Sequence, residues 1–243
     1  MKTKKIVIIQ TGEAIVTAKN MYGDFDRWFI RGMGVDESKT QTFRVFEQLV
    51  FPKKQDVAGI IITGSSAMVT EEAIWSEATI CWLEQFISTR VPIIGVCYGH
   101  QILAKLLGGI VDWNPNGREL GLVTMRLTEN TRTDILFSQI VDEQTHNLKF
   151  LASHQQSVIS LPQKATLLGA TKIDKNHCFS YDNHIWGLQF HPEFTPEIIK
   201  DYIRFRYDDI KKEGLNPDQM IAKIENITNG PTLLQKFAEI CFQ

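Results

Sequence analysis

The sequence lacks most of the features that mark fibrous, disordered and nucleic-acid-binding proteins. It has only 16 glycines and 8 prolines among 243 residues, too few for a fibrous or disordered chain. Its 26 Lys and Arg are balanced by 28 Asp and Glu, a net charge of −2, and it contains no basic run. This balance excludes the electrostatic footprint of a nucleic-acid-binding protein. The remaining composition, 43% hydrophobic and 22% charged, is that of an ordinary globular protein.

Long hydrophobic runs and paired cysteine motifs are missing as well. The apolar run Ile6–Ile9 follows a basic start, but a secretory signal needs about 7–15 apolar residues and a membrane span about 18. The cysteines contain no C-x-x-C pair, so neither a zinc site nor a disulfide framework is indicated. We therefore expect a reducing, cytoplasmic location, in which any one thiol is free to act as a nucleophile. The four cysteines are Cys81, Cys97, Cys178 and Cys241.

The first half of the chain alternates between strand and helix patterns. Three short runs rich in β-branched residues predict fully buried strands, and such strands indicate a parallel sheet covered by helices on both faces. The predicted strands are Ile6–Gln10, Gly59–Thr63 and Pro92–Val96. Apolar spacing predicts helices over Glu71–Ser88 and after Gly99, and a shorter one over Phe43–Val50.

The second half favours antiparallel strands and then helices. Strand patterns separated by polar turns occur at residues 120–127, 150–152, 165–170, 177–181 and 185–190. Beyond Thr195, Pro196 is suited to open a helix, and further helical segments follow at residues 218–227 and 232–240. The pattern predicts one α/β domain with a helical C-terminal extension.

The segment Gly95-Val96-Cys97-Tyr98-Gly99 has the form of a nucleophile elbow. It follows a predicted buried strand and precedes a predicted helix, the context that this sharp turn requires. The turn needs small residues on both sides of the nucleophile, and it leaves Cys97 near a helix N-terminus, where a thiolate is favoured. The alternative is an ordinary buried cysteine, and the strand-turn-helix context favours catalysis.

A thiol nucleophile needs a base, and the base needs a group that orients it. Gln189-Phe190-His191-Pro192-Glu193 supplies both at the end of a strand pattern. On an extended segment His191 and Glu193 project to the same face, so Glu193 would hold one ring nitrogen while the other accepts the proton of Cys97. Taken alone, a His-x-Glu pair is more often a solvated pair or half of a metal site.

The two motifs together resemble the class I glutamine amidotransferases, which use a Cys-His-Glu triad. The matching segments are Gly95–Gln101, Leu106–Gly109 and Phe190–Glu193, and the likeness extends from about Lys4 to Thr195. Gly23-Asp24-Phe25 and the His-Gln pair after the elbow are most similar to the stand-alone, GMP-synthase-like branch, which includes γ-glutamyl peptidases. The resemblance implies a three-layer, flavodoxin-like domain over residues 1–195, with a mainly parallel central sheet and added antiparallel strands. Residues 196–243 would be a helical extension packed on the same domain.

The resemblance also implies how the catalytic residues would act. Cys97 would attack the side-chain amide of glutamine or another γ-glutamyl group and form a thioester, with His191 as base and then acid, and Glu193 as its orienter. The oxyanion donors would be the backbone N–H groups of Tyr98 and Gly64. The family has a Gly-Gly-Pro turn at the second position, where this chain reads Thr63-Gly64-Ser65-Ser66. This departure leaves open whether the oxyanion hole is preformed.

The substrate contacts implied by the resemblance are Gln101, Ser65 and His154. The family often has an aspartate at the position of Gln156, so contacts to the amino acid end of the substrate are expected to differ. His154 has an equally good reading as a hydrogen-bonded structural residue. No metal and no cofactor are expected, because His146, His177 and His184 show no ligand spacing.

Three functions are compatible with these motifs. The first is a self-sufficient hydrolase of glutamine or γ-glutamyl compounds, which the stand-alone chain and the altered turn favour. The second is a glutaminase that delivers ammonia to a separate synthetase, because the chain lacks a G-x-x-x-x-G-K-[ST] nucleotide loop. The third is a non-catalytic binding or thiol protein on the same fold, which would not need His191 and Glu193. Small γ-glutamyl molecules are the expected ligands, with no nucleic acid and no membrane partner.

Overall fold

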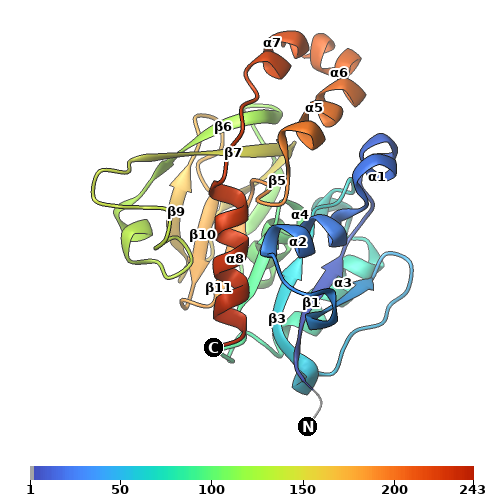
Figure 1. The fold of residues 1–243 in the computed structure, drawn as a ribbon, viewed down its shortest axis with the longest axis vertical. Coiled ribbons are helices and arrows are strands. Elements are labelled where there is room, and N and C mark those ends of the chain that lie inside the picture. Colours follow the sequence, from blue (N-terminus) through green and yellow to red (C-terminus); the bar gives the residue numbers. More distant parts are fainter. Residues whose placement is uncertain (1–2) are drawn as a thin grey trace.

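A nine-stranded sheet forms the centre of the computed structural model, which describes residues 3–243 (Figure 1). Its strand order is β2-β1-β3-β4-β11-β10-β9-β6-β7, and a separate two-stranded sheet pairs β5 with β8. The strands are β1 (Lys5–Gln10), β2 (Thr40–Arg44), β3 (Val57–Ile62), β4 (Ile93–Val96), β5 (Ile110–Trp113), β6 (Glu119–Leu127), β7 (Asn147–His154), β8 (Gln156–Ser160), β9 (Thr166–Ala170), β10 (Cys178–Tyr181) and β11 (Ile185–Leu188).

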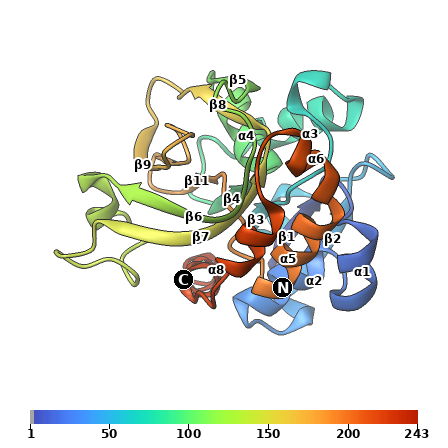
Figure 2. The ribbon, with the colours of Figure 1, turned by 90° about the horizontal axis from the view of Figure 1, so that it is seen from above.

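Strands β2, β1, β3, β4 and β11 run parallel in the sheet. All of these except the edge strand β2 are buried on both faces. In β1, Ile6 and Ile8 belong to one core with residues of α2 (Phe25–Met33) and α8 (Asn229–Cys241). Val7 and Ile9 face the other core, which α3 (Ile74–Glu84) and α4 (Tyr98–Leu106) cover. The two helix layers lie on opposite sides of the sheet (Figure 2). This double covering explains why the strands read as continuous apolar runs, and it confirms the predicted α/β class.

The other half of the sheet is antiparallel, as the second half of the sequence predicts. β11 joins the halves, because it runs parallel to β4 and antiparallel to β10. Beyond β10, the pairs β10–β9, β9–β6 and β6–β7 are all antiparallel. The register of β6 against β7 sets Glu119 opposite His154, close to the pocket described below.

Helices α5 to α8 form the end of the chain: α5 (Pro196–Phe205), α6 (Tyr207–Lys212), α7 (Pro217–Ala222) and α8. The Thr195 hydroxyl caps α5 by accepting from Ile198 N, and Pro196 occupies its first turn. Leu233, Leu234 and Phe237 of α8 enter the same core as β1 and β4. The division at residue 195 stays a prediction. Within residues 3–243 no helix combines the length and the apolar character needed to cross a membrane.

Several predicted elements differ from the structure. The predicted helix over Phe43–Val50 is wrong: Thr40–Arg44 is strand β2, because it pairs in parallel with β1. The apolar residues of this segment therefore serve a sheet edge, and pairing overrides local helical spacing. The pattern also missed α1 (Val16–Tyr22) and α2, although the Asp24 side chain accepts from Phe25 N at the start of α2.

A close approach between layers lies where α4 starts, directly beyond β4. A Cβ added at Gly99 would overlap the backbone oxygen of Ile62 in β3, and one added at Gly95 would overlap the backbone of Gly99. Both obstacles are backbone atoms of well-packed elements, so they have little room to shift. Only glycine therefore allows the helix to leave the sheet at this angle.

We expect the substitution Gly99→Ala to lower the free energy of unfolding by about 3 kcal/mol, because the new methyl group collides with backbone. Gly108→Ala is the control. Gly108 has a φ of +92° with nothing within 4 Å of an added Cβ, so it should lose only about 1 kcal/mol through backbone strain. Urea unfolding measures both variants. Equal losses would show that steric overlap at Gly99 is unimportant.

Candidate active site

Cys97 occupies a strained turn between β4 and α4. Its backbone angles are φ 52° and ψ −100°, a left-handed φ that non-glycine residues rarely adopt and that costs about 1–3 kcal/mol. The turn is held because Cys97 N donates to Leu188 O at 2.8 Å and because the flanking glycines allow the close approach of α4. Such strain at a reactive side chain is typical of a nucleophile elbow.

His191 and Glu193 lie side by side beyond β11. His191 Nδ1 donates to Glu193 Oε1 at 2.7 Å, and both side chains are buried. The predicted strand 185–190 ends at Leu188, and the pair is brought together by a turn at Pro192, not by an extended segment. His191 N donates to Leu151 O at 2.7 Å, which fastens this turn to β7.

The surroundings of His191 favour its protonated form. Burial lowers the pKa of His191, but the neighbouring Glu193 carboxylate and the Cys97 sulfur outweigh burial and raise this pKa to about 10. The ring of Phe194 stacks on the imidazole, with centroids 4.0 Å apart. His191 and Cys97 line the same pocket. The imidazole is therefore fixed in position, and its protonated form is favoured beside the Cys97 sulfur.

Gly64 lies directly against the same imidazole. A Cβ at this position would come within 2.9 Å of His191 Cε1 and 3.7 Å of Cys97 Cβ. The two peptide groups around Gly64 are held by hydrogen bonds. Thr63 O accepts from Gly99 N and from Thr11 Oγ1, while Gly64 O accepts from the hydroxyls of Thr11 and Thr63. The turn is thus fixed by two buried threonines, where the family has Gly-Pro.

Tyr98 places its two functional groups in different surroundings. It is the first residue of α4, so its backbone N–H has no partner within the helix. Its hydroxyl lies within hydrogen-bond distance of Ser76 Oγ, 2.9 Å away, in the core between α3 and α4. Burial raises the pKa of this phenol to about 12. Only the backbone of Tyr98 is therefore available next to Cys97.

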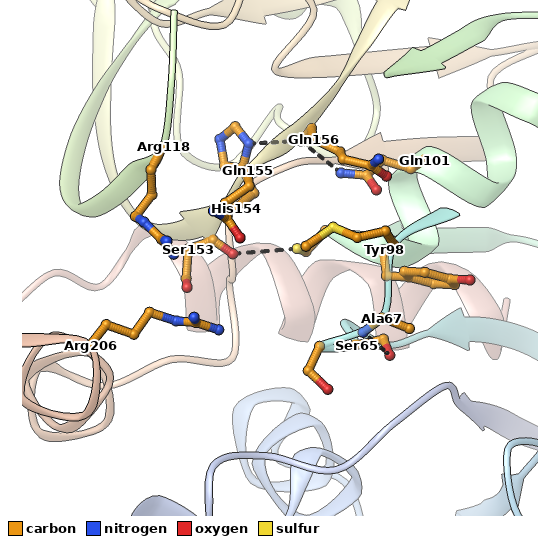
Figure 3. A pocket seen from close by; sticks show the side chains of 13 residues that line it. Ser65, Ala67, Tyr98, Gln101, Arg118, Ser153, His154, Gln155, Gln156 and Arg206 are labelled. Carbon is orange, nitrogen blue, oxygen red and sulfur yellow. Dashed lines mark hydrogen bonds between the residues drawn. The ribbon is translucent and has the colours of Figure 1, made fainter. Parts of the chain in front are cut away.

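Cys97 also lines a second pocket (Figure 3), which has a cavity volume of about 40 Å³. This volume is smaller than the about 300–1,000 Å³ of most small-molecule sites. Cys97 Sγ donates to Ser153 O at 3.6 Å. Ser65 and Gln101 line the pocket as the sequence predicts, and the guanidinium groups of Arg118 and Arg206 extend toward Ser153 from opposite sides.

The two glutamines beside the pocket are largely occupied by protein partners. Gln101 Nε2 donates to Gln156 O and to Gln189 Oε1. The Gln156 side chain accepts from Val69 N and donates to Thr70 Oγ1. At the position where the family often has an aspartate, this chain therefore uses its side chain to hold the segment at residues 69–70.

His154 has both ring nitrogens engaged. Nδ1 donates to Gln156 O at 3.0 Å, and Nε2 lies 3.0 Å from Glu119 Oε2. The hydrogen-bonded structural reading therefore fits His154 better than direct substrate contact. His177, for which the sequence shows no ligand spacing, lies in the same buried cluster, because Asp174 and Glu119 approach its Nδ1 within 3.2 and 3.3 Å.

Sequence reasoning did not find Arg118 and Arg206. Arg118 precedes β6 and Arg206 follows α5, so they are far apart in the sequence and in no motif. Arg118 forms a bidentate salt bridge with Glu213, whereas the buried Nε of Arg206 has no partner among residues 3–243. Burial and the neighbouring Arg118 lower the pKa of Arg206.

Fold and site together define a three-layer α/β protein with a cysteine on a strand-to-helix elbow beside a buried His–Glu pair. The family model for class-I glutamine amidotransferases matches residues 18–207. The chain belongs to this family.

Similar proteins include both hydrolases and synthetases. γ-Glutamyl peptidase 5 of Arabidopsis thaliana is 30% identical over 76% of this chain and 74% of its own length. The GMP synthase of Wigglesworthia glossinidia brevipalpis is 29% identical over 72% of this chain but only 34% of its own length. Among solved structures, a glutamine amidotransferase from Methylobacillus flagellatus has a TM-score of 0.77 at 18% identity, covering 98% of this chain and 95% of its own. That structure shows the likeness of the fold.

We expect Glu193→Gln to lower the pKa of His191 toward or below the ordinary 6.5. The substitution removes the carboxylate charge that raises this pKa, while burial still lowers it. In the unchanged protein the folded-state pKa is raised. The protonated ring therefore contributes stability that is complete below about pH 6.5 and is lost as the pH rises toward 10. NMR titration of the His191 ring measures the pKa directly. Glu197→Gln, at an exposed position in α5, is the control, and an unchanged His191 in Glu193→Gln would contradict the assigned cause.

Proposed function

We propose that the protein hydrolyses the side-chain amide of glutamine, or another γ-glutamyl amide bond, through a thioester on Cys97. The observation that carries the proposal is the placement of Cys97 on a strained elbow in one pocket with the buried His191–Glu193 pair. The likeness to γ-glutamyl peptidases supports the same class of reaction.

The reaction would proceed in two halves. His191 takes the proton of the Cys97 thiol as the sulfur attacks the amide carbon. The resulting tetrahedral intermediate then collapses as the protonated ring gives this proton to the leaving nitrogen. Ammonia or an amine departs, and a γ-glutamyl thioester remains. A water molecule, deprotonated by His191, then attacks the thioester carbon, and glutamate leaves as the Cys97 sulfur is released. Glu193 keeps the ring in the orientation that both halves require.

The negative oxygen of each tetrahedral intermediate needs backbone donors. We assign them to the N–H groups of Tyr98 and Gly64. Tyr98 supports this role because it starts α4, where the N–H is unpaired and the helix dipole is favourable. The threonine hydroxyls that hold the turn at Gly64 support a hole that is formed before the substrate binds.

The two arginines favour a substrate with a carboxylate close to the scissile bond. A γ-glutamyl group carries its α-carboxylate a few bonds away from the amide carbon. Arg206 has a buried Nε without a partner in the described part of the chain, whereas Arg118, which also lines the pocket, is already paired with Glu213. A guanidinium in this position would pair with that carboxylate.

A second candidate is a glutaminase that passes its ammonia to a synthetase on another chain. The match to only about a third of a GMP synthase favours this alternative, because that part would correspond to an amidotransferase domain without its synthetase. A partner-dependent glutaminase and an autonomous hydrolase share the thioester chemistry and differ in activity without a partner. Four free thiols are compatible with the reducing cytoplasm that we assign to either version.

The decisive assay measures ammonia and glutamate release from L-glutamine by the purified protein, and amine release from a γ-glutamyl dipeptide. We expect turnover of at least one substrate by the unchanged protein and its loss in Cys97→Ser. Cys81→Ser, which removes an exposed thiol, is the matched control and should keep full activity. Activity that survives in Cys97→Ser would refute the mechanism.

If the purified protein turns over neither substrate, labelling of Cys97 with a glutamine-like electrophile distinguishes the remaining functions. If a glutamine-like electrophile labels Cys97 although glutamine is not turned over, the partner-dependent glutaminase is supported. If the electrophile fails to label Cys97 as well, the chain is a non-catalytic member of its family.

We expect Arg206→Gln to raise the KM for a γ-glutamyl substrate about 10- to 100-fold, the value of a lost charged hydrogen bond, with a smaller change in kcat. Arg204→Gln is the control, because Arg204 is an exposed residue that pairs with Asp201. Steady-state kinetics separate the two parameters. An unchanged KM in Arg206→Gln would show that the carboxylate is held elsewhere.

A further inference from the structure

A second cluster of chemically capable side chains lies behind the pocket wall. It consists of Glu119, His154, Asp174 and His177, all of them buried. Glu119 starts β6, His154 ends β7, and Asp174 and His177 belong to the loop between β9 and β10. The proposed reaction uses none of these side chains. Two carboxylates and two imidazoles are therefore removed from water at one point, which is costly unless their charges are compensated.

The spacing of the four nearest atoms is that of a coordination shell. His154 Nε2 lies 3.0 Å from Glu119 Oε2 and 3.9 Å from Asp174 Oδ2, and His177 Nδ1 lies 3.3 and 3.2 Å from the same two oxygens. All four atoms lie within 4.8 Å of one another. Ligands about 2.0–2.2 Å from a tetrahedral ion are separated by roughly 3.3–3.6 Å, close to most of these separations.

The hydrogen bonds around the cluster leave ring nitrogens available as ligands. His154 Nδ1 donates to the backbone oxygen of Gln156. In the neutral ring this leaves a lone pair on Nε2, directed at the carboxylates, which is the arrangement found for histidines that bind metal. His177 Nδ1 donates to Asp174 Oδ2 at 3.2 Å, whereas its Nε2 has no hydrogen-bond partner in residues 3–243. The ring proton can therefore move to Nε2 when Nδ1 presents its lone pair to an ion.

From this geometry we propose that Glu119, His154, Asp174 and His177 bind a divalent transition-metal ion, with Zn²⁺ as the best match. Two nitrogens and two carboxylate oxygens in a tetrahedral arrangement suit Zn²⁺, whereas Mg²⁺ and Ca²⁺ require six or more oxygens. One divalent cation with two neutral imidazoles would also neutralise both carboxylates, which otherwise need two imidazolium protons.

The ion would have a structural role. It would join β6, β7 and the loop at residues 171–177, directly behind Ser153 and Gln156, which line the pocket. It would not touch Cys97, and its binding does not depend on the proposed hydrolysis. We therefore expect binding and thermal stability, not catalysis, to report on it most directly.

The test uses the full chain with Cys97→Ser, so that the thiol and His191 offer no competing site. After removal of metals with a chelator, a competition titration with a chromophoric chelator measures the affinity for Zn²⁺. We expect one equivalent to bind, and we expect His177→Asn and Asp174→Asn each to weaken binding about 100-fold or more. His146→Asn, which changes an exposed histidine, should bind as tightly as the parent protein.

Two further measurements keep the test decisive if the ligand variants fail to fold. A 100-fold excess of Zn²⁺ over its Kd should raise the Tm of the Cys97→Ser parent by about 5 °C or more, reversibly on adding chelator. Co²⁺ should give the intense visible bands of four-coordinate geometry without sulfur-to-cobalt charge transfer. Absence of both effects, or Zn²⁺ binding that His177→Asn leaves unchanged, would overturn the proposal and identify the cluster as an ion-pair network of protonated histidines.

Discussion

The close approach of α4 to the sheet is the constraint on which the site depends. Gly95 and Gly99 allow the helix to begin against the backbone of β3 and β4. In the resulting sharp turn Cys97 adopts a left-handed φ. The side chain, at the N-terminus of a helix, thereby lies at the border of the core, where it lines the pocket. A larger residue at either glycine would move the helix and with it the thiol.

The second requirement is electrostatic. His191 is buried, and burial alone would keep its ring neutral, yet the adjacent Glu193 carboxylate reverses this preference. The turn at Pro192 and the hydrogen bond to β7 hold the pair in place, while Phe194 stacks on the ring. Glu193 therefore contributes both to the orientation of the ring and to its protonation, which suits the proposed role of His191 as a base toward Cys97 and then as an acid toward the leaving nitrogen.

Local patterns predicted the parts of the molecule that short segments encode. The buried strands, the elbow at Cys97 and the His191–Glu193 pair each lie within a few consecutive residues, so spacing and residue type were informative. Strand β2 was mistaken for a helix because its pairing with β1 is a long-range contact. Arg206 and His177 were missed for the same reason: tertiary structure brings Arg206 to the pocket and His177 to Glu119 and Asp174. The catalytic and substrate-binding roles remain predictions.

The most direct test of the account is mass spectrometry of the protein after acid quenching during turnover of a γ-glutamyl substrate. The account predicts a γ-glutamyl adduct on the peptide that contains Cys97, and none on the peptide that contains the exposed Cys81. Turnover without an adduct on Cys97, or with an adduct on another residue, would contradict the proposal that the elbow cysteine is the nucleophile.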